Sequence, residues 1–343
     1  MINRRGFARL LSLATAAVSL SPPVRAAARR TIKPRRLAPG DTVGLVLPAS
    51  AAFEADSISF AREQLEALGL NVAIAPHAYD RWGYFAGRDR DRADDINRMF
   101  ADDRIAGIVC YTGGWGSPRV LPYLDYDLIA KKPKVFIGFS DITALLNAIT
   151  QRTGLVTFHG PVASSTFETY SVENFRRVVM TPEPAGVLAQ PEKRPNLLVD
   201  RANRVIRLAP GRASGRLAGG NLTMLAAGMG TPYEVDTDGA ILFAEDTNED
   251  IYRVDRMLTQ LALGGKLDRM AGFVFGRCTE CSVRPSMFSL EDVLRDRFGG
   301  LAKPALSGLS FGHIEQKLTL PVGVRATVDA DAGTLSLDEA AVV

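Results

Sequence analysis

The chain has 343 residues, of which 46% are hydrophobic and 23% are charged, and its formal net charge is +3. This is the balance of a globular protein with ample material for a core, and the length suggests two domains. No run of 18 or more apolar residues is present, which argues against a membrane-spanning helix in the mature chain.

Residues 1–28 predict an export signal of the twin-arginine type. The pair Arg4-Arg5 precedes an apolar run at 10–20, and three alanines at 26–28 form a small-residue cleavage site. The alternative is an arginine-bearing amphipathic helix, but the A-x-A box argues against it. Cleavage would remove four arginines and no acids, changing the net charge from +3 to about −1. We therefore expect a periplasmic protein that binds neither nucleic acid nor, after cleavage, the membrane.

Strands and helices alternate through the next part of the chain. Five short apolar runs are predicted to be strands, at 42–52, 71–75, 105–111, 135–138 and 156–158. Helical spacing is found between them, at 53–68, 89–100, 117–129 and 141–152. This alternation predicts a parallel sheet covered on both faces, whose loops at the carboxyl ends of the strands form a binding crevice.

The polar segment 179–213 is predicted to link two domains. It has no helical period and is interrupted by five prolines: Pro182, Pro184, Pro191, Pro195 and Pro210. We therefore expect an N-terminal domain at 29–178 and a C-terminal domain at 214–343. In the latter, helices are predicted at 219–228, 251–263 and 290–298, and strands at 240–244, 270–276, 305–309, 323–328 and 333–337. Strands predominate late in the chain, so this domain is expected to be a β-rich mixed one.

A glycine-rich turn follows the third predicted strand. Gly113, Gly114 and Gly116 allow a sharp turn and a close approach to a ligand. Ser117 and Pro118 then suit the start of a helix. This order lifts a serine hydroxyl to the carboxyl end of a sheet, so Ser117 is either a helix cap or a nucleophile. Because Pro118 has no N–H, a nucleophilic Ser117 would need oxyanion donors from the glycine loop.

A serine nucleophile needs a base, and the base needs an orienting acceptor. The mature chain offers three histidines: His77 in a loop, His159 at the end of the fifth strand, and His313 in a Gly-His turn. The residues alone leave the choice of base open.

The nucleophile and the acid also have rivals. Ser140, followed by Asp141, is a second candidate nucleophile. Glu245 and Asp246 both follow the strand at 240–244, and a carboxylate at a strand end can accept the second N–H of an imidazole. The residues alone do not choose between these alternatives either.

Three separated blocks resemble the LD-carboxypeptidase family of serine peptidases, also called muramoyltetrapeptide carboxypeptidases, which includes the microcin-immunity peptidases. The first block is YTGGWGSPRVLPYLDYD from Tyr111, with GFSDIT from Gly138. The second comprises 219–222, 230–233, 241–246 and 252–258, and the last is Gly312-His313 with 320–323. Together the matches extend from about residue 42 to about residue 337.

The resemblance implies a catalytic triad of Ser117 as nucleophile, Glu245 as acid and His313 as base. It implies a Rossmann- or flavodoxin-like N-terminal domain, a β-rich C-terminal domain, an active site between them and a homodimer. The implied reaction removes the terminal D-alanine from murein tetrapeptides at the L,D bond after meso-diaminopimelate, without metal or organic cofactor. Oxyanion and substrate contacts are expected from Gly113, Gly114, Trp115 and Gly116. Arg119 is the candidate for the substrate carboxylate, with a solvated helix residue as the alternative.

The sequence departs from the family pattern at three places. Trp115 and Phe139 stand where the family usually has tyrosine, and no second glycine follows Gly312-His313. Two alternative functions are an amidase of the microcin-immunity kind, with Trp115 stacking on a nucleobase, and a non-catalytic binder of wall peptides in the periplasm.

Three cysteines are too few for a disulfide framework. Cys278 and Cys281 form a C-x-x-C pair, but no second pair completes a zinc site. We expect two packed thiols, with a redox pair or a local disulfide as the alternative.

Overall fold

The computed structural model describes residues 30–54, 56–193, 196–200, 203–282 and 288–343. Residues Thr31–Val343 form one compact unit, to which everything below belongs. The predicted export signal lies outside the described residues. None of the described helices is long and apolar enough to cross a membrane.

The first sheet has six strands in the order β12-β5-β4-β3-β1-β2. Their bounds are β1 Thr42–Val46, β2 Asn71–Ile74, β3 Ile105–Cys110, β4 Val135–Gly138, β5 Thr157–His159 and β12 Leu320–Val322. The first five are parallel, as predicted, while β12 returns from late in the chain and joins β5 antiparallel. The central strands are buried on both faces, which explains why they read as continuous apolar runs.

The helices of this part are α2 Ser57–Ala67, α3 Asp89–Ala101, α4 Tyr126–Lys131, α5 Thr143–Thr153 and α6 Thr169–Phe175, with a π-helical turn η4 at Arg176–Met180. The continuous helix predicted from Ser117 is wrong. Two 3-10 turns, η1 Ser117–Arg119 and η2 Leu121–Tyr123, precede α4. Pro118 and Pro122 lack the N–H that a regular helix requires, so the chain makes only short turns here.

The second sheet has eight strands in the order β6-β14-β13-β8-β9-β10-β11-β7. Their bounds are β6 Gly186–Val187, β7 Ile206–Ala209, β8 Arg212–Asn221, β9 Ile241–Thr247, β10 Gly272–Thr279, β11 Ala305–Ser307, β13 Arg325–Asp329 and β14 Thr334–Leu337. The run β8-β9-β10-β11 is parallel and the remaining pairs are antiparallel. Both edge strands, β6 and β7, come from the segment predicted as a linker.

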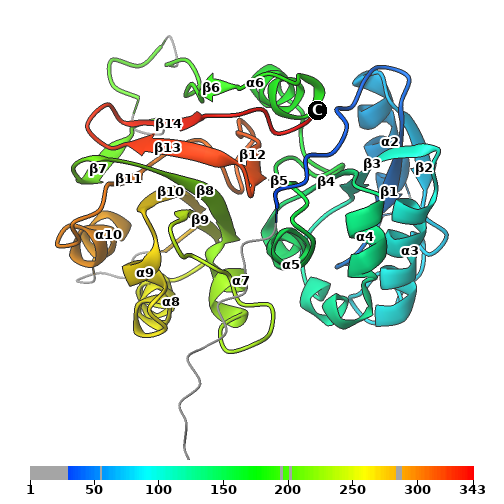
Figure 1. The fold of residues 1–343 in the computed structure, drawn as a ribbon, viewed down its shortest axis with the longest axis horizontal. Coiled ribbons are helices and arrows are strands. Elements are labelled where there is room, and N and C mark those ends of the chain that lie inside the picture. Colours follow the sequence, from blue (N-terminus) through cyan, green and yellow to red (C-terminus); the bar gives the residue numbers. More distant parts are fainter. Residues whose placement is uncertain (1–29, 55, 194–195, 201–202, 283–287) are drawn as a thin grey trace, which may run out of the picture. The chain divides into compact units, whose positions relative to one another are not determined.

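Four helices gather on one side of the second sheet in Figure 1: α7 Leu222–Ala227, α8 Ile251–Leu263, α9 Lys266–Arg269 and α10 Leu290–Phe298. A parallel sheet domain followed by a β-rich mixed part is the fold class that the sequence predicts. Helix α9 and strand β12 were not predicted, because four and three residues are too short to show a period.

Helix α5 lies between the two sheets (Figure 1). Its side chains form hydrogen bonds with the backbone at the end of β8, where Gly219 and Gly220 form a glycine pair. The Asn147 amide donates to the Gly219 carbonyl over 2.8 Å, and the Asn221 N–H donates to the Thr143 hydroxyl over 2.9 Å. Gly220 has φ +139°, and a Cβ there would lie 2.4 Å from the Thr143 hydroxyl. Only glycine allows this close approach.

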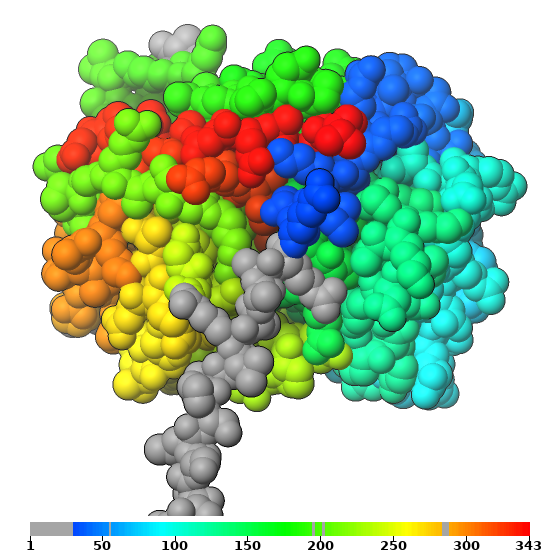
Figure 2. All heavy atoms as spheres, viewed as in Figure 1, coloured from blue at the N-terminus to red at the C-terminus, as the bar shows by residue number. Residues whose placement is uncertain are grey.

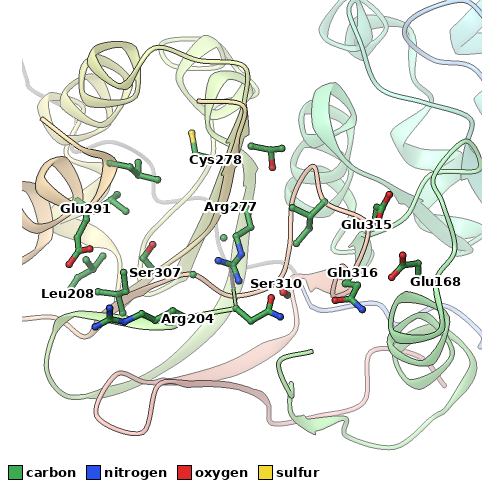
Figure 3. Close-up of a pocket in the computed structure, with 18 residues that line it drawn as sticks. Glu168, Arg204, Leu208, Arg277, Cys278, Glu291, Ser307, Ser310, Glu315 and Gln316 are labelled. Atoms are coloured by element: carbon green, nitrogen blue, oxygen red, sulfur yellow. The ribbon is translucent and has the colours of Figure 1, made fainter. Parts of the chain in front are cut away.

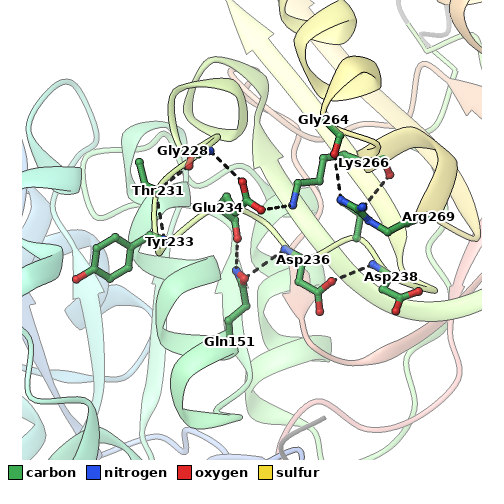
Figure 4. A network of polar contacts seen from close by, with 12 residues as sticks. Gln151, Gly228, Thr231, Tyr233, Glu234, Asp236, Asp238, Gly264, Lys266 and Arg269 are labelled. Atoms are coloured by element: carbon green, nitrogen blue, oxygen red, sulfur yellow. Dashed lines mark hydrogen bonds and ion pairs between the residues drawn. The ribbon is translucent and has the colours of Figure 1, made fainter. Parts of the chain in front are cut away.

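A second polar network joins α5 to the loop before β9 (Figure 4). The Gln151 side chain donates to the Glu234 carbonyl and accepts from the Asp236 N–H, at 3.3 and 3.2 Å. The Glu234 carboxylate in turn pairs with the buried Lys266 ammonium at 2.9 Å.

The two ends of the compact unit lie side by side. The Arg36 N–H donates to the Val343 carbonyl, and the Val343 N–H donates to the Pro34 carbonyl, so the first blue and the last red residues are neighbours in Figure 2.

Cys278 and Cys281 form a disulfide, with their Cα atoms 5.5 Å apart. The expectation of two packed thiols is therefore wrong. The pair closes the turn in which β10 ends, where a three-residue separation brings the two sulfurs together. Cys110 is a buried free thiol on β3.

The two sheets also meet in an aromatic cluster around His159, the last residue of β5. The rings of Phe139, Phe243 and Phe311 lie 5.4–6.2 Å from its imidazole, centroid to centroid. Neither imidazole nitrogen of this fully buried side chain has a hydrogen-bond partner among the described residues. Burial lowers the pKa of His159 from 6.5 to about 4, so the ring is neutral at physiological pH.

We expect His159→Phe to make the fold more resistant to acid. The unfolded chain takes up a proton on this residue below pH 6.5, whereas the folded chain does so only near pH 4. The stability linked to this group is complete above the upper value and is lost as the pH falls towards the lower one, by about 3 kcal/mol. Urea unfolding of both proteins at neutral and acid pH measures the difference.

The control is His77→Gln, which should lose more stability than wild type at acid pH and little at neutral pH. A hydrogen bond to Asp95 raises the pKa of His77, so its contribution is present at low pH and is lost as the pH rises. If wild type and His159→Phe lose stability equally on acidification, a neutral buried His159 is contradicted.

Candidate active site

Ser140 is the first residue of the 3-10 turn η3, Ser140–Ile142, which connects β4 to α5. Its φ is +63°, in the left-handed region that non-glycine residues seldom adopt. Such strain costs on the order of 1–3 kcal/mol and is concentrated at functional sites. A serine on a strained turn from strand to helix presents its hydroxyl at the carboxyl end of the sheet. This is the geometry that the sequence led us to expect of Ser117.

His313 lies in the loop between β11 and β12 and contacts both partners of a triad. Its Nε2 lies 2.9 Å from the Ser140 Oγ. Its Nδ1 lies 2.7 Å from the Glu245 Oε2. The predicted contact between Glu245 and His313 is therefore present, and the serine that completes it is Ser140.

Glu245, on β9, is fully buried beneath the imidazole. Burial alone would raise its pKa, but the hydrogen bond and charge of His313 outweigh it and hold the pKa below its ordinary value. The carboxylate is therefore an ionised acceptor for the Nδ1–H of His313.

Asp246, the rival acid, points to the other face of β9 because successive side chains alternate along a strand. It accepts hydrogen bonds from Asn221 and Thr223 at the start of α7. Burial raises its pKa to about 6. Asp246 therefore fixes a helix end and does not contact the imidazole.

Gly312 makes the contact between His313 and Glu245 possible. Its φ is +113°, and a Cβ at this position would lie 2.7 Å from the Glu245 Oε2. Both the backbone conformation and the space require glycine.

Ser117 does not contact the imidazole in this structure, so the predicted pairing with His313 is not seen, and its role as the nucleophile stays a prediction. Its side chain is buried, its N–H donates to the Asp141 carboxylate over 2.7 Å, and its hydroxyl donates to the Asp141 carbonyl oxygen. Ser117 thus holds the residue that follows Ser140. One signal in the sequence favoured Ser140: Asp141 retains the N–H that an elbow uses as an oxyanion donor, whereas Pro118 has none.

The glycine loop packs against the Ser140 turn. A Cβ on Gly113 would lie 2.7 Å from the Ser140 Cβ, 3.0 Å from its Oγ and 3.1 Å from the Asp141 nitrogen. Gly114 and Gly116 have positive φ and face other neighbours, the Ser50 hydroxyl and the Phe85 ring. Gly113 is thus the glycine of the loop that reaches the serine.

Trp115 and Arg119 lie further along the same loop. Trp115 is 62% exposed and stands edge-on to Tyr84. The Arg119 guanidinium donates three hydrogen bonds to the Asp89 carboxylate, at 2.8–3.1 Å. This pairing favours the alternative reading of Arg119, a surface residue with a structural partner.

The remaining histidines have other surroundings. His77 pairs with Asp95 at 2.8 Å, and His159 is enclosed by aromatic rings. Within the described part of the chain, no group of three or more histidine, cysteine or carboxylate side chains is placed to hold a metal ion.

The sequence matches two family models. Residues 43–160 match the LD-carboxypeptidase N-terminal domain, and residues 214–328 match the LD-carboxypeptidase C-terminal domain. A protein of Bacillus subtilis named "Probable murein peptide carboxypeptidase" is 38% identical over 309 residues, covering 89% of this chain and 94% of its own.

Two solved structures are similar throughout. The microcin self-immunity protein MccF in complex with aspartyl sulfamoyl adenosine has a TM-score of 0.83 and 28% identity, covering 91% of this chain and 100% of its own. The muramoyltetrapeptide carboxypeptidase from Oxalobacter formigenes has a TM-score of 0.73 and 30% identity, covering 87% of this chain and 98% of its own. With both domain models matched in order along the chain, this protein belongs to the LD-carboxypeptidase family of serine peptidases.

Proposed function

We propose that this peptidase removes the terminal D-alanine from murein tetrapeptides by cleaving the L,D bond after meso-diaminopimelate, through an acyl-enzyme on Ser140. The continuous contact from Ser140 through His313 to Glu245 carries this proposal. The names of the relatives, murein peptide and muramoyltetrapeptide carboxypeptidase, support the substrate.

In the first half-reaction the Ser140 Oγ attacks the scissile carbonyl carbon, and His313 Nε2 takes the hydroxyl proton. Glu245 holds the imidazole in the tautomer that leaves Nε2 free to accept, and stabilises the imidazolium that forms. When the C–N bond breaks, His313 returns the proton to the amine of D-alanine, which leaves.

The negative charge on the carbonyl oxygen requires N–H donors. The Asp141 N–H follows the nucleophile, and Gly113 lies against both residues, so we assign the oxyanion site to the Asp141 amide and the amides of the Gly113-Gly114 turn. Each such donor is worth about 10²–10³ in kcat. In the second half-reaction His313 takes a proton from the water that attacks the acyl carbon. When the ester C–O bond breaks, His313 returns this proton to the Ser140 Oγ, and the shortened peptide leaves.

An amidase of the microcin-immunity kind is the second candidate function. Trp82, Tyr84 and Trp115 are exposed and lie around the glycine loop, where a nucleobase could stack on them. MccF has been solved with aspartyl sulfamoyl adenosine. Release of an amino acid from an aminoacyl-nucleotide amide, but not from a tetrapeptide, would favour this candidate.

The predicted homodimer and periplasmic location stay predictions. An export signal at residues 1–28 would bring the enzyme to the compartment in which murein peptides are exposed.

We expect Ser140→Ala to abolish turnover and Ser117→Ala to reduce it only moderately. Loss of a triad serine costs about 10⁴-fold or more in kcat. Ser117 acts through one side-chain hydrogen bond to Asp141, whose loss corresponds to about tenfold. Release of D-alanine from disaccharide-tetrapeptide, followed by mass spectrometry, measures both. Turnover by Ser140→Ala together with inactivity of a folded Ser117→Ala would refute the assignment.

Gly312→Ala should impair catalysis by separating His313 from Glu245. The added Cβ needs the space of the carboxylate oxygen at 2.7 Å, so we expect a loss of about 10²-fold or more in kcat. Gly300→Ala is the matched control, because a Cβ there meets nothing within 4 Å. Equal activities in the two variants would show that the spacing at Gly312 is not needed.

A further inference from the structure

A cavity of about 740 Å³ opens beside the loop that carries His313 (Figure 3). Ile314, Glu315 and Gln316, which directly follow the triad histidine, line it. The opposite wall includes the end of β10, the strand next to the one that carries Glu245. The backbone N–H of Arg277 on β10 also donates to the carbonyl of Phe311, two residues before His313. The cavity therefore shares the His313 loop with the triad, and its β10 wall pairs with β9, the strand that carries Glu245.

Arg277 projects into this cavity with unmet hydrogen-bonding capacity. Its Nη2 is buried and has no hydrogen-bond partner among the described residues. Figure 3 shows its guanidinium between the two walls. Burial lowers the pKa of Arg277, although Asp200 and Tyr170 oppose the effect, and a guanidinium stays charged in proteins. A buried guanidinium nitrogen without a partner is costly, so an anionic ligand would complete the site.

Two carboxylates in the same cavity are also available. Glu168 and Glu315 lie on one side of Arg277 in Figure 3, and no hydrogen bond or ion pair to their side chains is formed by a described residue. Glu291, on the other side, is paired with Arg295 at 2.7 Å. The cavity lining thus combines Arg277, whose Nη2 has no partner among the described residues, and a second arginine, Arg204, with the carboxylates of Glu168 and Glu315, which complements a ligand that carries both charges.

We propose that this cavity binds the zwitterionic end of the diaminopimelyl side chain, with its carboxylate on Arg277 and its ammonium on Glu315 and Glu168. The inference rests on the proposed function, since that end of the residue carries a free carboxylate and a free ammonium. The other carboxylate of the substrate, on the terminal D-alanine, has no ammonium beside it, and the two glutamates would repel it. The charge pattern therefore favours the side chain over the peptide terminus.

The test compares two tetrapeptides that differ only at the third residue, meso-diaminopimelate or L-lysine. Lysine keeps the side-chain ammonium and lacks the distal carboxylate. Wild type should prefer the diaminopimelate peptide in kcat/KM by about 10- to 100-fold, the effect of one charged hydrogen-bonded contact. Arg277→Gln should lose this preference and keep its rate on the lysine peptide. Glu315→Gln should slow both peptides, because both carry the ammonium.

Arg207→Gln is the matched control. Arg207 lies on β7 near the cavity, is paired with Asp331 and does not line the cavity. This variant should retain the preference of wild type. Circular dichroism and thermal unfolding of each variant establish that it is folded.

Three outcomes would overturn the inference. One is an unchanged preference in Arg277→Gln. Another is loss of discrimination only between peptides ending in D-alanine and in D-alaninamide, which would assign Arg277 to the terminal carboxylate. The third comes from calorimetric binding of the two product tripeptides, which needs no turnover: equal affinities in wild type would exclude the subsite. Absence of D-alanine release by wild type, with discriminating binding intact, would instead count against the proposed function.

Discussion

The hydrogen bond between the Glu245 carboxylate and the His313 imidazole is the contact on which the site depends. It joins β9 of the second sheet to the loop before β12, and that loop presents Nε2 to Ser140 at the end of β4 in the first sheet. Ser140, the proposed nucleophile, and His313, its proposed base, thus come from parts of the chain 173 residues apart. The interfaces between the two sheets, α5 against the glycine pair and the aromatic cluster at His159, therefore determine catalytic geometry as well as stability.

The surroundings of Ser140 explain how a strained turn persists. A positive φ at serine costs free energy, so neighbouring residues must hold the backbone in this conformation. Ser117 holds Asp141 through backbone and side chain, and Gly113 packs against the serine itself. The glycine-rich segment 113–117 thus packs against Ser140 and Asp141 and supports the turn that carries the proposed nucleophile.

The sequence predicts the regular elements of this fold better than the contacts between distant segments. Buried parallel strands and amphipathic helices follow from apolar periodicity, so β3, β4, α3 and α8 were predicted within about two residues. Glu245 and His313 follow from the family resemblance. The same resemblance implies Ser117 as the nucleophile, whereas the local pattern does not separate Ser117 from Ser140, because both follow a strand and precede a helical turn. The choice between them depends on which hydroxyl the His313 loop reaches, a contact between distant segments. The disulfide and the edge strands β6 and β7 also could not be predicted, because they depend on how the surrounding segments pack in the folded chain.

The most direct test of the central claim is to locate the covalent adduct of a serine-reactive fluorophosphonate probe. Trypsin separates the two candidates, because Ser140 falls in the peptide 135–152 and Ser117 in the peptide 105–119. Mass spectrometry of the labelled enzyme should find the added mass on the former peptide, and Glu245→Gln should slow its appearance. Label on the latter peptide, with 135–152 unmodified, would contradict the account.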